Sequence, residues 1–148
     1  MPLLVLTFCA ESQAQVGVAS RDAVGAVVPT DTTRWRPVAA PAGRRVFVDA
    51  EALRRGGGVV EVWTWHAYAS AHRPVFGVPY DRVLARDQVY CRVRATAPLQ
   101  VVRYLGAASA GAFMFPPDVG PFGWAPGSVE EAVGTWACQE AGGAAGAR

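Results

Sequence analysis

Two histidines, His66 and His72, are the side chains of this chain best suited to metal binding or proton transfer. A zinc site needs three or four ligands at a recognisable spacing, and no third ligand accompanies these histidines. Serine, histidine and aspartate all occur, but the G-x-S-x-G motif that presents a nucleophilic serine is absent. Asp49 lies where a strand is expected to meet a turn, a position at which aspartate usually has a structural role. The sequence therefore predicts no catalytic residue, no metal site and no cofactor.

A second group of residues has the chemistry of an anion-binding surface. Arg92 and Arg94 are expected to project from the outer face of one strand, with Arg103 beside them on the next strand. Such a stripe would suit an acidic polysaccharide or an acidic protein surface, and the alternative is an ordinary solvated sheet face. Trp124, in the loop before the last predicted element, is the aromatic residue best placed to join a binding surface.

Two tryptophans share one face of the most strongly predicted strand. Trp63 and Trp65 are two residues apart, with Glu61 two residues earlier, so the three side chains project from the same side. Tandem aromatic residues on a sheet can form a binding platform. One face of a sheet is more often packed as core, and core packing is the interpretation that we favour for this pair.

Composition indicates one small β-rich domain. The chain has 148 residues, 51% of them hydrophobic, with 16 glycines and 11 prolines, which suits short strands joined by turns. All 14 basic residues are arginine, and 12 acidic residues leave a net charge of +2. This near balance argues against nucleic acid or an anionic membrane surface as the partner.

The first predicted strands lie in the first half of the chain. Residues 45–50 (RVFVDA) alternate with the two-residue period of a strand. Residues 54–58 (RRGGG) are predicted as a turn, and residues 59–68 (VVEVWTWHAY) form the strongest strand because they are rich in β-branched and aromatic side chains. Residues 69–80 contain two prolines and a glycine, which predicts a loop.

Further strands are expected in the second half. Residues 89–96 (VYCRVRAT) show the cleanest alternation, which predicts a strand with Cys91 on its core side. A proline interrupts that run, and residues 99–106 are predicted to return as the second strand of a hairpin. Within residues 107–125 we expect at most a short strand around 113–115, and loop elsewhere.

The last predicted element is a helix over residues 129–138. Ser128 and Glu131 have the spacing of a capping box, and acidic residues in the first turn favour the positive end of a helix. The helix is expected to end at Cys138, followed by a disordered tail at residues 139–148. Its apolar face is predicted to consist of Val129, Ala132, Val133, Trp136 and Ala137.

The amino-terminal residues indicate export. Residues 2–10 form an apolar run that is too short to span a bilayer, which takes about 20 residues. The run fits the hydrophobic region of a signal peptide, although no basic residue precedes it, and Ser12 and Ala14 supply the small residues that a signal peptidase reads. We therefore predict a signal peptide at residues 1–14 and a flexible leader at 15–33. The alternative is a buried strand that begins the fold.

Cys9 offers a different amino terminus. It would be the acylated residue of a lipoprotein, although Phe8 stands where a small residue is expected before such a cysteine. This lipid anchor would be the chain's one attachment to a membrane, because no other segment approaches membrane-spanning length.

Removal of a signal peptide would leave two cysteines, Cys91 and Cys138. An even pair in an exported chain predicts a disulfide, whereas two separate buried thiols would fit a cytosolic protein better. Cys91 is expected on the inner face of a strand and Cys138 at the end of the helix, so the bond would clamp the helix onto the sheet. Closing a loop of this length contributes about 4 kcal/mol in the chain-entropy treatment.

In order along the chain, these pieces resemble the surface-adhesin protein E-like family of bacterial envelope proteins. The resemblance is carried by Trp35, by VFVDAEALRRGGGVVEVW (46–63), by VYCRVR (89–94), by RYLG (103–106) and by APGSVEEAVGTWAC (125–138). It implies a compact, curved antiparallel sheet with the terminal helix tethered to its concave side by the disulfide. It also implies homodimerisation and a role in adhesion, but the segment with which the founding member binds host proteins has no match here.

These observations together predict an α+β, mainly β domain over residues 34–138 that is exported and works by binding rather than catalysis. Its ligand would be an unidentified protein or polysaccharide, in the periplasm, on the outer membrane surface or outside the cell. The alternatives are a structural or accessory periplasmic domain without a host-facing role and, less favoured, an enzyme.

Overall fold

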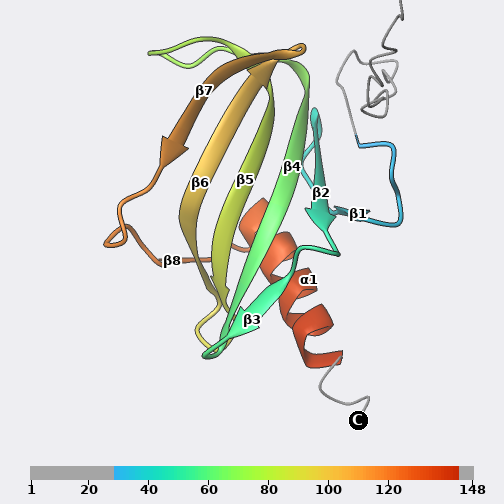
Figure 1. Cartoon of the computed structure of the whole chain (residues 1–148), viewed down its shortest axis with the longest axis vertical. Coiled ribbons are helices and arrows are strands. Elements are labelled where there is room, and N and C mark those ends of the chain that lie inside the picture. Colours follow the sequence, from blue (N-terminus) through green and yellow to red (C-terminus); the bar gives the residue numbers. More distant parts are fainter. Residues whose placement is uncertain (1–28, 144–148) are drawn as a thin grey trace, which may run out of the picture.

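The computed structural model describes residues 29–143 and shows an antiparallel sheet with a helix packed against it (Figure 1). The predicted signal peptide, Cys9 and the leader up to residue 28 lie outside the described residues, as do residues 144–148. The elements are β1 (Trp35–Val38), β2 (Arg44–Asp49), β3 (Arg54–Gly56), β4 (Val59–His72), β5 (Tyr80–Tyr90), β6 (Ala95–Leu105), β7 (Ala108–Met114), β8 (Phe122–Gly123) and α1 (Val129–Gly143).

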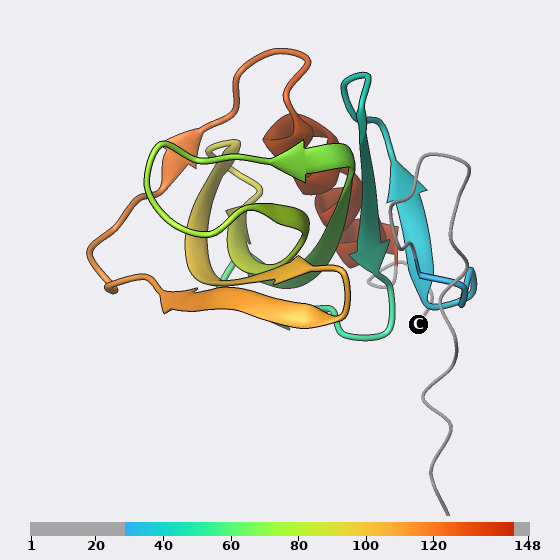
Figure 2. The ribbon, with the colours of Figure 1, turned by 90° about the horizontal axis from the view of Figure 1, so that it is seen from above.

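Within this part of the chain the strands form a single sheet in the order β1-β2-β4-β5-β6-β7, with β3 paired to β4 and β8 paired to β6. All pairs are antiparallel. Seen from above, the sheet curves around the side that carries α1 (Figure 2). The predicted fold class, a curved antiparallel sheet with a carboxy-terminal helix on its concave face, is confirmed.

The two strands predicted first along the chain, β2 and β4, lie side by side in this sheet. β2 pairs with β4 so that Val46 lies opposite His66 and Val48 opposite Thr64. Their β-branched residues pack well on a pleated surface, which explains why these two strands can be predicted from the sequence. The predicted turn at residues 54–58 is half correct, because residues 54–56 form the short strand β3 and the chain reverses at Gly57 and Gly58.

The predicted strand at residues 89–96 is wrong. β5 ends at Tyr90, residues 91–94 form a turn, and β6 begins at Ala95. Arg94 adopts a positive φ of 51°, which strand geometry does not allow. The alternation of apolar and polar residues continues through this turn, because Val93 fits the pattern although its side chain is exposed. A two-residue period therefore does not show where the chain reverses direction.

The predicted loop at residues 69–80 is shorter than expected, because β4 continues to His72 and β5 begins at Tyr80. The pairing of the two strands is irregular between Ala67 and His72, so the polar end of β4 departs from the regular register. No element had been predicted for residues 81–88. Charged side chains within β5 obscured its strand character.

The strand predicted at residues 99–106 is part of β6, which begins earlier and runs through Pro98. The register shifts there, since Arg86 pairs with Gln100 whereas Asp87 pairs with Pro98. One extra residue is thereby inserted in β6, and such bulges accommodate a proline within a sheet. β7 spans residues 108–114, a longer strand than the one expected around 113–115.

The main core lies between the sheet and the helix. Side chains that alternate along β2, β4 and β5 point toward α1, which contributes a stripe with a spacing of four residues. The buried residues of this core are Val46, Val48, Val60, Val62, Val89, Val129, Val133 and Ala137.

The buried face of the helix differs in part from the predicted one. The buried stripe is Val129, Val133 and Ala137, whereas Trp136 is only half-buried and packs at the margin of the core. Positions four residues apart advance by slightly more than one turn, so the stripe drifts away from Trp136. A Trp136→Ala substitution should therefore cost less than the 3–5 kcal/mol typical of a fully buried aromatic ring.

The two ends of the helix differ in how well they were predicted. Glu131 donates its backbone N–H to Ser128 Oγ at 3.1 Å, as the capping box requires, but its carboxylate accepts from the N–H of Gly127 at 2.8 Å instead of that of Ser128. At the other end, α1 continues to Gly143, so residues 139–143 are helical and the predicted disordered tail is wrong there. Glutamine, glutamate and alanine are good helix formers, which explains the extension.

Candidate functional site

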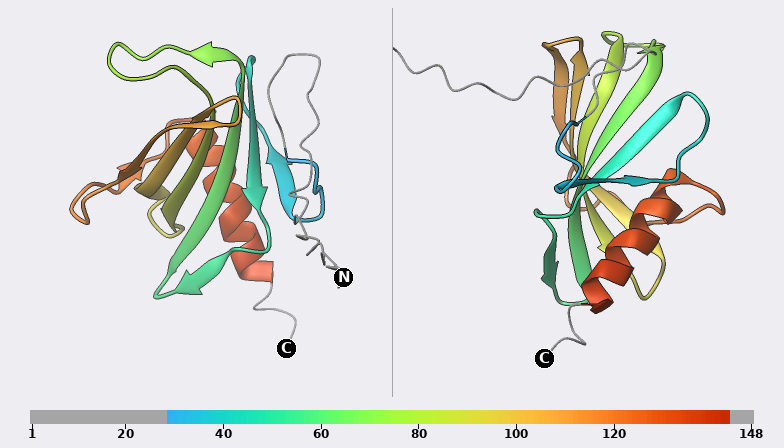
Figure 3. Two further views of the ribbon diagram at one scale, coloured as in Figure 1. Left: turned by 45° about the horizontal axis from the view of Figure 1, so that its top comes forward. Right: turned by 90° about the vertical axis from the view of Figure 1, so that its right-hand side faces the viewer.

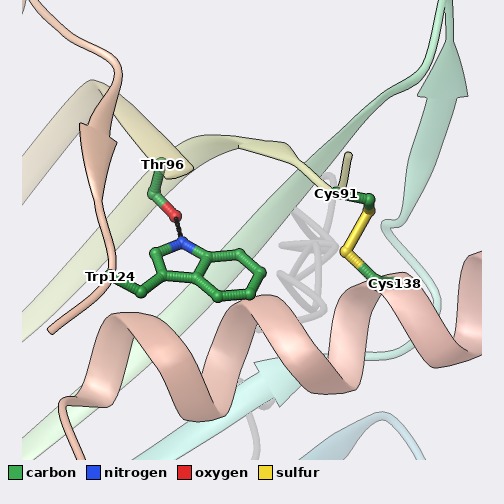
Figure 4. Close-up of a disulfide and its surroundings, with 4 residues drawn as sticks. All are labelled: Cys91, Thr96, Trp124 and Cys138. Carbon is green, nitrogen blue, oxygen red and sulfur yellow. Dashed lines mark hydrogen bonds between the residues drawn. A yellow bond between two sulfur atoms is a disulfide. The ribbon is translucent and has the colours of Figure 1, made fainter. Parts of the chain in front are cut away.

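The Cys91–Cys138 disulfide connects the lower end of the β5–β6 hairpin to the helix (Figure 4). The two Cα atoms lie 5.7 Å apart, within the range that a disulfide permits, and the predicted pairing is confirmed. Cys91 is the first residue of the turn after β5 rather than a residue on the inner face of a strand. The bond therefore fixes the helix to a hairpin turn.

Trp124, predicted as an exposed binding residue, instead joins the sheet to the helix. Its indole Nε1 donates a hydrogen bond to Thr96 Oγ1 at 2.8 Å, and its ring lies against the helix at Gly134 (Figure 4). The guanidinium of Arg94 lies 5.1 Å from the ring centroid and also pairs with Glu131 at 2.7 Å. Trp124 is half-buried, and these contacts indicate a packing role.

The three arginines predicted to form one stripe are separated in the structure. Arg92 is exposed in the β5–β6 turn, and Arg94 is engaged with Trp124 and Glu131. Arg103 lies near the other end of β6, where it pairs with Val83 and Gly111. The stripe does not form because the chain reverses between Arg92 and Arg103.

The outer face of the sheet carries both predicted tryptophans. Trp65 packs against a second buried cluster, with its ring 6.0 Å from that of Trp35 in an edge-to-face arrangement. Trp63 lies under the guanidinium of Arg86, 5.8 Å from the ring centroid, and Arg86 forms two hydrogen bonds to Glu61. The contacts of Trp65 confirm the packing interpretation, and Trp63 is half-buried beside it.

The upper half of the inner face, beyond the helix in Figure 1, carries a row of arginines and aromatic rings that we call the inner-face ladder. Each of the consecutive strands β2, β4, β5, β6 and β7 contributes one residue. In sheet order these are Arg44, Tyr68, Tyr80, Arg103 and Phe113.

Neighbouring members of the ladder are in contact along its whole length. The Arg44 guanidinium lies 5.4 Å from the Tyr68 ring centroid, and the Tyr68 and Tyr80 rings meet edge to face at 5.8 Å. The Arg103 guanidinium lies 4.7 Å from the Tyr80 centroid and 4.9 Å from that of Phe113. These distances are within the range of cation–π attraction, so the rings hold both guanidiniums in place.

His66 fixes one end of the ladder. Its Nδ1 faces the Arg44 guanidinium, and its Nε2 lies 2.8 Å from Thr64 Oγ1. Burial, together with the charge of Arg44, lowers the pKa of His66 to about 3, so the ring is neutral at physiological pH. Nδ1 then accepts from Arg44 and Nε2–H donates to Thr64. Because the acceptor carries no charge, the charge of Arg44 is not compensated by it.

Within residues 29–143, Arg44 and Arg103 also have no carboxylate partner. The ion pairs among the described residues involve Arg34, Arg82, Arg86 and Arg94 instead. The Nε atoms of Arg44 and Arg103 are buried without a hydrogen-bond partner, which costs on the order of 1–3 kcal/mol each. Burial raises the pKa of Tyr68, so this phenol stays neutral and does not compensate Arg44. The ladder therefore carries two arginines that form no ion pair within the described part of the chain.

His72 contacts this cluster through its ring. It lies 5.0 Å from the Tyr80 ring and 5.9 Å from the Tyr68 ring. Among residues 29–143, no group of three or more histidine, cysteine, aspartate or glutamate side chains is placed to hold a metal ion.

The β4–β5 loop at residues 73–79 presents large apolar side chains to solvent beside the ladder. Val75 and Phe76 are 90% and 89% exposed, and Val78 is 55% exposed. Figure 3 shows this loop extending away from the rest of the sheet at its upper end. An exposed apolar loop tip of this kind is typical of a contact surface.

Two of the hollows elsewhere on the described molecule are relevant here. A groove of about 660 Å³ runs between β1 and α1, where Val38, Ala40 and Trp136 provide an apolar wall. A smaller hollow of about 390 Å³ is lined by Asp87, Thr96, Pro98 and Glu130 among others. Burial and the nearby Glu130 carboxylate raise the pKa of Asp87 to about 7. Asp87 and Glu130 are the two carboxyl groups of this hollow, and its lining residues include no basic side chain.

An Asp87→Asn substitution should raise the stability of the protein at pH 8 and leave it nearly unchanged at pH 4. The folded-state pKa lies above the unfolded value, so folding is weakened as the pH rises from about 4 to about 7. The gain at pH 8 has an upper limit of about 4 kcal/mol, which corresponds to the full shift. Urea unfolding at the two pH values measures it, with exposed Asp118→Asn as the control. An equal gain at both pH values would refute the titration of Asp87.

Several site residues could not be identified from the sequence. Tyr80 lay in a predicted loop, and Arg44, Tyr68 and Phe113 belong to strands that are far apart along the chain. Of the ladder residues, the sequence predicts only Arg103 as a binding residue. The alternation of Arg44 with Val46 and Val48 was a usable signal, because it places a charged residue on the same face as the core.

The part of the chain that the structure describes contains no helix long and apolar enough to span a membrane. Neither the curated proteins nor the solved structures include a match to this chain. The family model described as surface-adhesin protein E matches residues 35–139, which is more than half of the chain. The match covers every strand, both cysteines of the disulfide and most of the helix. The chain therefore belongs to the surface-adhesin protein E family.

Proposed function

We propose that this chain is an exported binding domain of the bacterial cell envelope that acts through its surface rather than through an active site. The observation that carries the proposal is the family match over residues 35–139, which includes the disulfide-bonded cysteines. Structural disulfides persist in oxidising compartments, so the bond supports export.

The upper end of the sheet is the surface that we assign to binding. It combines the inner-face ladder with the exposed apolar tip of the β4–β5 loop, around Val75 and Phe76. Arginine and aromatic residues dominate the energetics of protein interfaces. The disulfide and the helix brace the opposite end, so this surface is presented on a rigid support. Homodimerisation, as the family resemblance implies, remains a prediction.

Fractionation of the native cells, followed by mass spectrometry of the intact protein, tests export. We expect a chain that begins after Ala14, or at an acylated Cys9, with Cys91 and Cys138 oxidised. Recovery from the cytoplasm with Met1 or Pro2 intact and both thiols free would contradict the proposal. A correctly processed protein confined to the periplasm would favour the accessory-domain alternative.

A further inference from the structure

We propose that the inner-face ladder binds an acidic polysaccharide through the guanidinium groups of Arg44 and Arg103. This inference deepens the proposed function, on which it rests, by naming the site and the chemical class of the ligand. It starts from the two positive charges that lack a carboxylate partner on the concave side of the sheet. A bound anion would supply the negatively charged partner that these two guanidinium groups lack.

The guanidiniums are held ready for an anion. Arg103 lies between the rings of Tyr80 and Phe113, and Arg44 is held by Tyr68 and by the neutral His66. A guanidinium fixed in this way presents N–H groups with the planar geometry that matches a carboxylate or a sulfate. The rings already restrict the arginine side chains, so little conformational entropy is lost when a ligand binds to them. Both residues remain partly exposed, so a ligand can reach them.

The spacing of the two charges favours a chain-like ligand. Arg44 is on β2 and Arg103 is on β6, with β4 and β5 between them. Three strand spacings of about 4.8 Å separate their backbones by about 14 Å along the sheet. The rings of Tyr68 and Tyr80 stand between the two guanidiniums in the row, and a polymer with repeated negative charges can contact an arginine on each side of them at once.

The rest of the ladder favours a saccharide over a protein segment. Tyr68 and Tyr80, together with the neighbouring His72, carry hydrogen-bonding atoms, and among the ladder's rings only Phe113 is purely apolar. The most exposed apolar side chains, Val75 and Phe76, which would anchor a protein partner, lie outside the ladder on the β4–β5 loop. Hydroxyl and imidazole groups beside arginines suit the hydroxyl and carboxylate groups of an acidic sugar.

Binding of purified polysaccharides to the mature, disulfide-bonded protein tests this assignment. The probes are polygalacturonate and dextran sulfate, with neutral dextran as the uncharged comparison, in titration calorimetry at low and moderate salt. We expect binding of at least one acidic polymer, weakened by salt, and none of neutral dextran. Arg44→Gln and Arg103→Gln should each weaken binding by about 10-fold or more, the effect of losing a charged hydrogen bond.

The controls separate a ligand-binding role from a structural one. Arg54→Gln removes the same charge from an exposed position on β3, at the other end of the sheet, and should change binding by less than about 2-fold. Arg103→Lys keeps the charge over the two rings but loses the planar group, so it should fold normally and still bind more weakly. Melting temperatures of all variants identify any that fail to fold.

Three outcomes would overturn the inference. The first is no binding of either acidic polymer, and the second is an equal loss in Arg54→Gln, which would indicate diffuse charge attraction. The third is tighter binding of polyglutamate than of either acidic polysaccharide, which would assign the ladder to acidic protein segments. None of these results bears on the export of the protein, so this inference can fail while the proposed function stands.

Discussion

Reduction of the Cys91–Cys138 disulfide should lower the free energy of unfolding by about 2–5 kcal/mol, a large share of the stability of a domain of this size. The cysteines are separated by 47 residues, and in the chain-entropy treatment a closed loop of this length accounts for about 4 kcal/mol. The unfolded chain regains this freedom when the bond is broken. The helix would then be held to the sheet by non-covalent contacts, chiefly the packing of Val129, Val133 and Ala137.

Urea unfolding with and without reductant measures the effect. The double variant Cys91→Ala with Cys138→Ala is the matched control, because reductant should leave its unfolding unchanged while its stability equals that of the reduced parent. A native protein whose two thiols react freely before reduction would contradict the bond. So would a reduced protein that is as stable as the oxidised one.

Gly134→Ala should destabilise the protein by about 2–4 kcal/mol, against the ordinary preference of helices for alanine. Gly134 is buried in the middle of α1, and a β-carbon there would overlap the six-membered ring of Trp124. The ring cannot give way easily, because its Nε1 donates to Thr96. Displacing it would also leave a hydrogen bond unmade, at a further cost of about 1 kcal/mol.

Gly142→Ala provides a control in the same helix. A β-carbon at Gly142 has no neighbour within 4 Å, so the substitution should be neutral or should stabilise the protein by up to about 1 kcal/mol. Thermal or urea unfolding of the two variants compares steric overlap with helix propensity directly. If Gly134→Ala proved as harmless as Gly142→Ala, the contact between Trp124 and the helix would be wrong.

The parts of the fold that could be predicted are those that local patterns encode. β2 and the first part of β4 are dense in β-branched residues, the helix begins at a capping serine, and two cysteines in an exported chain imply a bond. The pairing of Cys91 with Cys138 was correct even though the local conformation assumed for Cys91 was not. A disulfide requires only that the two cysteines lie close together. Cys91 would lie next to the helix in the predicted strand, and it does so in the observed turn.

What could not be predicted depends on chain reversals and on contacts distant in sequence. The turn at residues 91–94 keeps the alternation of a strand, so only its three-dimensional course reveals it. Because residues 89–96 were interpreted as one strand, Arg92 and Arg94 were predicted to share a surface with Arg103. The inner-face ladder requires the register of five strands, and no local pattern shows that Arg44 and Arg103 share a surface.

Labelling of intact cells with an antibody against the folded domain is the most direct test of the central proposal, that this member of the surface-adhesin protein E family is a surface-exposed binding domain. The antibody should be raised against the oxidised protein, since the disulfide-bonded fold is the form proposed to face the exterior. We expect unpermeabilised cells to label as strongly as permeabilised ones, with a periplasmic marker labelled only after permeabilisation. Labelling that appears only after permeabilisation would contradict surface display and would favour an accessory role inside the envelope.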